Sequence, residues 1–318
     1  MKLHQIRDVI AVAEKGSLRG ASRQLGLAQS AITRSIHQLE RELGAPLFER
    51  RQRGTILTPM GALFLRRARI ATSELGRARE EIQQHQGGVE GSVVACLSTV
   101  PHIALMPRAL PDFRKRYPKV HVHLVEGLVY SSVESRLKDG SADFYVGIVP
   151  DEGPAPDLKI EKLFDNTRVV MGRVGHPLAN ARSLSELADA EWVSAGDKAE
   201  VELAEIFRRH GLIPPRHLAM GDSALSLIVL IAYTDMLAIL PRQWTEFLPM
   251  RTMLQKIDVR ETISAPAVAL IRRADMPLTP AAEHLCDLLR RASLAQQQPI
   301  NASRRSPIRR VARVVHGQ

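Results

Sequence analysis

Residues 17–43 of this 318-residue chain, SLRGASRQLGLAQSAITRSIHQLEREL, contain two amphipathic helical patterns separated by a turn. The first pattern begins at Ser17, which is placed to cap a helix, and Gly26 ends it. Apolar side chains then recur on one face of the second pattern, at Ile32, Ile36, Leu39 and Leu43. The stretch predicts a helix-turn-helix unit, and an ordinary helical hairpin with a solvated face is the alternative.

The opposite face of the second predicted helix is polar. It carries Gln29, Ser30, Thr33, Arg34 and His37. Gln can pair bidentately with adenine and Arg with guanine, and Ser or Thr can contact a base or a phosphate. We expect these residues, with Ser17, to contact DNA. Double-stranded DNA is therefore the first partner to consider.

The next segment, APLFERRQRGTILTPMG from Ala45, predicts a β-hairpin with a basic tip. Arg50, Arg51 and Arg53 lie beside a glycine, and a short β-prone run ends at Thr58. Guanidinium groups on such a wing suit phosphates or a narrow minor groove, so they position a reading helix without specifying sequence. These three arginines and Thr58 join the expected DNA contacts.

The motifs GSLRGASRQL, LAQSAITRSIHQLERELGAPLFERR and LTPMG resemble the LysR-type bacterial transcriptional regulators, and the likeness extends through nearly the whole chain. It implies an N-terminal all-helical winged helix-turn-helix domain at 1–58. Two positions depart from the family's pattern: Ala28 stands where Ser or Thr usually caps the recognition helix, and Thr33 stands where Ser is commoner. A missing cap costs about 1 kcal/mol of local stability, which Gln29 or Ser30 could compensate.

The net charge of +10 lies at the two ends of the chain. Residues 1–88 hold 15 Lys and Arg against 8 Asp and Glu, and residues 89–295 hold 24 against 26. Residues 296–318 hold five arginines and no acid, and we expect this tail to be disordered. The distribution separates an electrostatic footprint for DNA from a nearly neutral body. Without a membrane-length apolar run or an apolar signal core, we expect a cytoplasmic protein with no membrane partner.

A long helix is predicted from Pro59 to about Gln86, because Pro suits the first helical turn and none follows. Its apolar seam, spaced by fours and threes, consists of Phe64, Ala68, Ala71, Leu75, Ala78 and Ile82. Such a seam predicts a paired helix, and a stripe packed on its own domain is the alternative. The resemblance favours a dimerisation helix at 59–88 and implies a homotetramer, a dimer of dimers. We interpret the glycine-rich residues 87–91 as a hinge.

Beyond residue 89, β-prone runs alternate with helical patterns, which predicts an α/β sandwich with a parallel sheet. Predicted strands lie at 92–97, 120–127, 143–149, 168–172, 236–241 and 266–273. Predicted helices lie at 103–116, 131–139, 201–210, 224–233 and 280–295. The resemblance implies a two-lobed, periplasmic-binding-protein-like (type 2) effector domain. Lobe I would span about 89–162 plus 266–295, and lobe II about 163–265.

Ligands of such sheets lie at the carboxyl ends of strands and near helix N-termini. Expected effector contacts are Ser98, Thr99, Val100, Gly127, Tyr130 and Gly147 in lobe I, and Ser194, Gly196, Asp222 and Ser223 in lobe II. The hydroxyls of Ser98 and Thr99 can touch a ligand, or they can only cap the following helix. Local likeness of VPHIALMP and RRADMPLTPAA to regulators of aromatic-sulfonate and sugar catabolism indicates a carboxylate, a sulfonate or a sugar acid.

Signatures of enzymes and metal sites are missing from the sequence. It has no GxSxG, P-loop, HExxH or GxGxxG motif, and His121 and His123 lack a Cys or carboxylate partner. We therefore expect no catalytic residue, metal or cofactor. Cys96 and Cys286 lack CxxC spacing, so a disulfide is not expected. Cys96, in the apolar run VVACL, is interpreted as a buried inert thiol, with a redox switch as the alternative.

Together these patterns predict a sequence-specific transcriptional regulator whose DNA affinity or bending responds to a small effector, anionic or sugar-like, bound between the lobes. The resemblance allows RNA polymerase as a further partner. The alternative is a cytoplasmic solute-binding protein, which would leave residues 1–88 unexplained. An enzyme on an α/β scaffold is a third hypothesis, and no acid, base and nucleophile constellation is visible for it.

Overall fold

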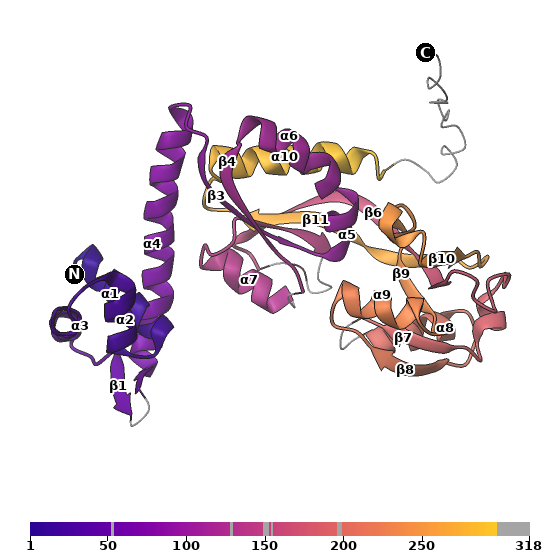
Figure 1. Cartoon of the computed structure of the whole chain (residues 1–318), viewed down its shortest axis with the longest axis horizontal. Coiled ribbons are helices and arrows are strands. Elements are labelled where there is room, and N and C mark those ends of the chain that lie inside the picture. Colours follow the sequence, from indigo (N-terminus) through magenta and orange to yellow (C-terminus); the bar gives the residue numbers. More distant parts are fainter. Residues whose placement is uncertain (52–53, 128–129, 149–152, 154, 196–198, 298–318) are drawn as a thin grey trace, which may run out of the picture.

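Three parts follow one another along the chain: a helical head, a long helix and a two-lobed body (Figure 1). The computed structural model describes residues 1–51, 54–127, 130–148, 153, 155–195 and 199–297. Within these ranges, no helix combines the length and the apolar character that crossing a membrane requires.

The head consists of three helices and a two-stranded wing. The second and third helices and the wing were predicted, whereas the first helix was not. Its elements are α1 (Leu3–Lys15), α2 (Leu18–Leu25), α3 (Gln29–Leu43), β1 (Phe48–Arg51) and β2 (Gly54–Leu57). Three of the four predicted apolar positions of α3, Ile32, Ile36 and Leu39, are buried against α1 and α2, whereas Leu43 is exposed. The period of the apolar side chains thus identified the helix-turn-helix correctly.

The wing is fixed to the head through backbone contacts that the sequence pattern did not reveal. The Glu40 carboxylate, at the end of α3, accepts hydrogen bonds from the backbone N–H groups of Leu47 (2.8 Å) and Phe48 (3.2 Å). Gly61 lies so close to the Leu47 carbonyl that a Cβ there would stand 1.9 Å from its oxygen. Only glycine fits this position, where α4 passes beneath the start of the wing.

The long helix α4 (Pro59–His85) confirms the predicted length, but its apolar seam divides into two halves. Phe64 packs against the core of the head, and Ala68 is buried. For these two residues, the interpretation as dimerisation contacts is wrong, because they pack on their own domain. The second half of the seam is exposed, and Leu75 and Ile82 are 53% and 60% accessible.

The C-terminal half of α4 lies against lobe I through polar contacts. Arg77 forms an ion pair with buried Asp143 at 3.0 Å, and Ser73 Oγ donates to the Gly140 carbonyl at 2.9 Å. Asp143 also accepts a hydrogen bond from the backbone N–H of Val94 at 2.7 Å. The helix is therefore attached to the sheet of lobe I by groups whose geometry is directional.

The glycine-rich segment after α4, expected to be a hinge, is a tight and bonded turn. Gly88 N donates to the Gln83 carbonyl at 2.8 Å. Buried Gln84 donates to the Glu90 carbonyl at 3.1 Å and accepts from the backbone N–H of Ala281 at 2.9 Å. A Cβ at Gly88 would stand 2.6 Å from the Gln83 oxygen, so this glycine permits a close contact.

Lobe I contains three helices that follow α4, three complete strands, parts of two strands that cross between the lobes, and the C-terminal helix. Its elements are β3 (Glu90–Leu97), α5 (Thr99–Ala104), α6 (Met106–Arg116), β4 (Lys119–Val125), α7 (Tyr130–Lys138), β5 (Phe144–Ile148), the first part of β6 (Leu158–Arg173), the second part of β11 (Ile263–Arg273) and α10 (Pro280–Leu294). The single helix expected at 103–116 is two helices, because the chain bends at Leu105 before Pro107.

The sheet is mixed and not parallel as predicted. It has seven strands, in the order β10-β6-β11-β5-β3-β4, with β9 also paired to β6. Only the β3–β4 and β3–β5 pairs are parallel, while β6 and β11 run antiparallel to their neighbours. The alternation of strands and helices suggested parallel pairing, but the two long strands that connect the lobes run in opposite directions.

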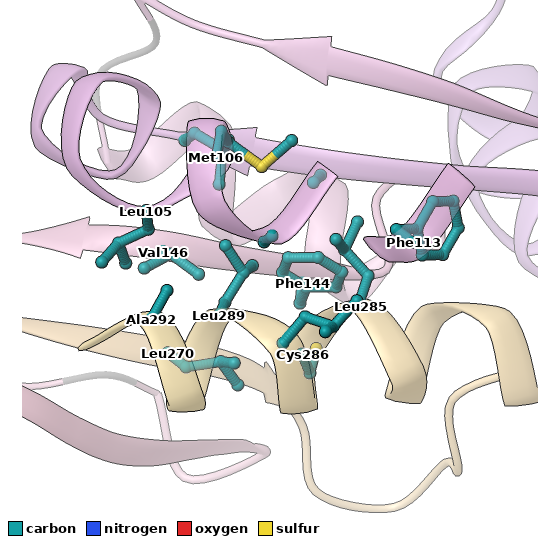
Figure 2. Packing of buried hydrophobic residues seen from close by; sticks show 14 of the residues in the cluster. Leu105, Met106, Phe113, Phe144, Val146, Leu270, Leu285, Cys286, Leu289 and Ala292 are labelled. Atoms are coloured by element: carbon teal, nitrogen blue, oxygen red, sulfur yellow. The ribbon is translucent and has the colours of Figure 1, made fainter. Parts of the chain in front are cut away.

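Helices α6 and α10 cover one face of this sheet, and α7 covers the other (Figure 1). Figure 2 shows the larger core, where Leu285 and Leu289 of α10 meet Phe113 of α6 and Phe144 of β5. Cys286 lies in this core, and Cys96 lies under α7. Burial raises the pKa of both thiols, and both cysteines are free, as expected for inert buried residues.

Lobe II surrounds the other ends of the connecting strands. Its elements are η1 (Leu184–Leu187), β7 (Glu191–Ser194), α8 (Ala199–Arg209), β8 (Arg216–Met220), α9 (Ala224–Ala232), β9 (Ala238–Pro241), η2 (Arg242–Thr245), η3 (Leu248–Met250) and β10 (Leu254–Ile257). Phe164 of β6 belongs to the core of lobe I and Val170 to that of lobe II, so the chain crosses between these residues.

The body extends slightly into the segment predicted as a disordered tail. Gln296 is 5% exposed and accepts two hydrogen bonds from Arg242, and Gln297 donates to the Leu163 carbonyl at 2.6 Å. The remainder of the predicted tail, 298–318, lies outside the described residues.

Candidate DNA-reading face and ligand cleft

The polar face of α3 lies on the surface of the head. Gln29, Ser30, Arg34 and His37 are exposed, and Thr33 is half-buried. Thr33 Oγ1 donates to the Gln29 carbonyl at 2.9 Å, and His37 Nδ1 lies 3.2 Å from the Glu40 carboxylate. Arg34 forms no ion pair with any described residue. The helix therefore presents a free guanidinium and a free amide, which are the groups that read guanine and adenine.

The starts of α2 and α3 differ in capping. Ser17 Oγ accepts from Gly20 N at 3.1 Å and thus caps α2. Ala28 precedes α3 without a side-chain cap, and no side chain of Gln29 or Ser30 bonds to a described group in its place. The helix α3 therefore starts without a cap, as the sequence predicted. The predicted compensation by Gln29 or Ser30 is not found among the described contacts.

The predicted DNA contacts of the wing are Thr58 and three arginines, and the structure describes only the Thr58 side chain. Thr58 is buried: its Oγ1 donates to the Pro46 carbonyl at 2.7 Å and accepts from Gly61 N at 2.9 Å. The prediction that Thr58 contacts DNA is wrong, because its hydroxyl caps α4. The side chains of Arg50 and Arg51, and all of Arg53, lie outside the described residues.

A cavity of about 270 Å³ lies between the lobes of the body. Lobe I contributes the ends of β3 and β5, and lobe II contributes α8, α9, β7 and β9, with the connecting strands forming the base. Four of the predicted effector residues line it: Ser98, Thr99, Val100 and Ser194. The rule that ligands lie at strand ends located this cleft.

Five of the other predicted effector residues do not belong to the described lining of the cleft, and the sixth lies outside the described residues. The five are Gly127, Tyr130, Gly147, Asp222 and Ser223, and the sixth is Gly196. Tyr130 instead packs edge-on against Tyr145, and Ser223 caps α9 by accepting from Ser226 N. For Tyr130 and Ser223, the local packing and the helix cap account for their positions near helix starts, without a ligand.

Two buried polar atoms at the cleft have no hydrogen-bond partner within the described part of the chain. They are Ser98 Oγ and Trp244 Nε1. Ser98 precedes α5 but its hydroxyl does not cap that helix, which removes the alternative that it only caps. An unpaired buried donor is costly, and a ligand that accepts a hydrogen bond would remove that cost.

Among the described residues that line the cleft, Arg168 and Glu202 carry charge. Arg168 extends from β6, with its side chain 16% exposed, and its guanidinium lies 2.9 Å from the Glu202 carboxylate on α8. The Glu202 side chain is 50% exposed. The cleft thus holds a largely buried cation whose partner is accessible to solvent.

Ser194 is held by His217. Its Oγ lies 2.6 Å from His217 Nε2, and His217 Nδ1 lies 3.6 Å from the Glu200 carboxylate. A hydroxyl, an imidazole and a carboxylate in this order occur in hydrolases, but 3.6 Å is too long for the hydrogen bond that orients a catalytic imidazole. The observed contact fixes the Ser194 hydroxyl at the cleft wall.

Four polar or aromatic cleft residues were missed by sequence reasoning: Asn166 and Arg168 of β6, Glu202 of α8, and Trp244 of η2. Asn166 Oδ1 accepts from buried Gln243 at 3.0 Å, which ties the base of the cleft to η2. The one available signal was a charged residue, Arg168, at the start of the β-prone run RVVMG. Its position became interpretable only once the strand was known to cross between the lobes.

A winged helix-turn-helix head, a long connecting helix and a two-lobed body with an interlobe cleft define a DNA-binding protein with a separate ligand-binding domain. Residues 3–62 match the bacterial regulatory helix-turn-helix protein family, lysR, and residues 86–293 match the LysR substrate binding domain. The chain belongs to the LysR family of transcriptional regulators. It is a DNA-binding regulator with an effector-binding domain and not an enzyme.

The similarity covers almost all of several relatives. The chain is 30% identical over 294 residues to the SDS degradation transcriptional activation protein of a Pseudomonas species, covering 90% of this chain and 95% of that protein. It is 25% identical over 298 residues to the regulator GbpR of Azospirillum brasilense, covering 92% and 87%. Full-length CbnR, solved with its target DNA, shares the fold with a TM-score of 0.69 and 22% identity, covering 92% of this chain and 100% of that one.

Proposed function

We propose that this regulator changes its DNA affinity or DNA bending when a small anionic or sugar-like effector fills the cleft between the lobes. The observation that carries the proposal is the cavity lined by Arg168, Ser98, Ser194 and Trp244, two of which have unpaired buried polar atoms. The solute-binding alternative leaves the exposed reading face of α3 without a role. We extend the proposal to a cytoplasmic location.

A thermal-shift screen of small organic acids and sugars tests the ligand part of this proposal. A ligand at one hundred times its Kd stabilises the folded protein by about 2.7 kcal/mol, which a melting curve resolves. An Ile239→Trp change, at a half-buried position that lines the cleft, should abolish the shift produced by any compound found. A shift that survives this change would place the effector elsewhere and contradict the proposal.

A gel shift with DNA from upstream of the gene tests the reading face. Arg34→Ala should relax sequence discrimination by about 1 to 3 kcal/mol if Arg34 reads a base. Arg51→Ala should weaken all sequences alike, since the wing is expected to contact phosphates. Unchanged discrimination in Arg34→Ala would show that α3 reads DNA with other residues.

We also propose that the chain forms a homo-oligomer, a dimer of dimers, in which the exposed half of the α4 seam makes the contact within each dimer. The supporting observation is that Ala71, Leu75, Ala78 and Ile82 remain exposed although they continue a heptad spacing. Leu75→Glu should lower the mass measured by light scattering, while Gln83→Glu, an equal charge change at an exposed position of the same helix, should not. Equal masses would exclude pairing through this surface.

A further inference from the structure

We propose that the cleft selects organic anions with an apolar body, and that Glu202 competes with the anion for Arg168. This inference rests on the proposed function, because it takes the cleft as the effector site. It adds the ligand class and a residue that sets the threshold for binding.

The polar groups that a ligand would meet in the cleft are mainly hydrogen-bond donors. Arg168 and Trp244 Nε1 can only donate hydrogen bonds, and the unpaired Ser98 hydroxyl can donate as well. The amide oxygen of Asn166 is already bonded to Gln243. Apart from the Glu202 carboxylate, which is paired with Arg168, donors therefore exceed free acceptors among the described lining residues. This suits a carboxylate, sulfate or sulfonate better than a sugar, whose hydroxyls must also donate.

The remaining wall of the cleft is apolar. It is formed by Val193, Leu203, Ile206, Leu227, Ile239, Leu240 and Pro241. A charged head without an apolar body would leave this surface against water, whereas an alkyl or aromatic body would bury it. The combination of three donors with an apolar wall defines an amphipathic anion.

Glu202 is the present ion-pair partner of Arg168 in the cleft. At 2.9 Å its carboxylate occupies the position beside Arg168 that an anionic head would take. Arg168 is largely buried, so an unpaired guanidinium there is unfavourable, and Glu202 supplies the counter-charge. Since Glu202 is half exposed, it can leave for solvent when a ligand carboxylate or sulfate replaces it. Ligand binding is thus an exchange of one anion for another.

Isothermal titration calorimetry on the full chain tests the exchange with three probes of equal chain length: octanoate, octyl sulfate and the neutral octanol. Glu202→Gln should tighten binding of the anionic probes about three- to tenfold and leave octanol unchanged. The matched control is Glu205→Gln on the same helix, which removes the same charge from an exposed pair with Arg209. Arg168→Met should weaken the anionic probes at least tenfold while the melting curve confirms folding.

The outcomes separate this inference from the proposed function. Equal tightening in Glu202→Gln and Glu205→Gln would overturn the competition, because only net charge would matter. Octanol binding as tightly as both anions, or no anionic probe binding wild type or Glu202→Gln, would overturn the ligand class. The proposed function would survive either result if an effector from the screen still loses binding in Ile239→Trp. A preference for octanoate over octyl sulfate, or the reverse, would support the inference and identify the head group.

Discussion

The two halves of α4 are held in different ways. The N-terminal half packs on the head through apolar side chains such as Leu65 and Phe64, whereas the C-terminal half is attached to lobe I by Ser73, Glu74 and Arg77. Apolar contacts are non-directional, but hydrogen bonds and ion pairs have a preferred geometry. The helix is therefore oriented by the effector domain, and the head is a separate apolar core at its other end.

The largest expected effect is that of Arg77→Met. It leaves the Asp143 carboxylate buried without its ion pair, which should cost about 3 kcal/mol in the free energy of unfolding at pH 7. Arg79→Met, which removes an exposed arginine of the same helix, should cost little. Urea unfolding of the full chain measures both. Equal losses in the two variants would contradict the polar attachment.

The loss in Arg77→Met should also depend on pH. Burial is the main cause that raises the pKa of Asp143 above its ordinary value of 3.8, and Arg77 opposes this shift. A carboxyl with a raised folded-state pKa destabilises the protein as pH rises through the interval between its unfolded and folded values. Without Arg77 that interval widens, so the deficit should shrink between pH 7 and pH 5. Arg77→Met combined with Asp143→Asn should remove this pH dependence.

The next largest effect is expected for Leu65→Ala, at the apolar end of α4. Leu65 is 8% exposed, and truncating a buried leucine costs about 2 to 3 kcal/mol. Hydrogen exchange should become faster in α1 and α3 and stay unchanged in lobe I. Leu27→Ala, at an exposed position of the head, is the control. Faster exchange throughout lobe I would mean that the two ends of α4 are not independent.

A smaller effect is expected for Gly140→Ala, at the turn that receives Ser73. Gly140 has a φ of 73°, and an added Cβ would lie 3.2 Å from Ser73 Oγ. Gly127→Ala is a matched control, because Gly127 has a φ of 74° and no described atom beyond its chain neighbours would lie within 4 Å of an added Cβ. Both changes carry the left-handed backbone cost of about 1 kcal/mol, and Gly140→Ala should lose about 1 kcal/mol more through the clash. Identical urea midpoints would show that the Ser73 contact is loose.

The smallest effect is expected for Glu74→Gln. Glu74 pairs with Arg273 at 3.0 Å, but Arg273 also bonds to Asp275 and so keeps an acidic partner. The loss should be about 0.5 kcal/mol and should decrease with added salt. Glu81→Gln, nearer the solvent on the same helix, serves as the reference. A loss comparable to that of Arg77→Met would shift the main attachment from Asp143 to Arg273.

The head was largely predictable from sequence, since its signals are local. The spacing of Ile32, Ile36 and Leu39 determines the buried face of α3, and the polar residues between them must then be exposed. Thr58 was assigned wrongly for the same reason: a threonine before a proline-initiated helix is also a cap, and sequence alone did not separate the two roles.

The cleft was predictable only in part, since its residues are brought together by the crossing strands. Ser98 and Ser194 follow strands and were found by that rule. Arg168, Glu202 and Trp244 come from three elements and share no local pattern. The strands β7, β8 and β10 were not predicted, and the predicted strand at 168–172 covers only the last part of β6, so the contribution of β6 to the base of the cleft was not anticipated.

The continuity of β6 and β11 limits how the lobes can move. These strands pair with each other from one lobe into the other, so rotation about a flexible linker would break ladder hydrogen bonds. The ladder is already irregular between Ala265 and Val268, and Ala265 and Pro266 line the cleft. Irregular ladders accept changes of twist at low cost. Closure around a ligand would therefore be a torsion of one shared sheet, in which the start of β5 and the end of β11 carry the attachment of α4.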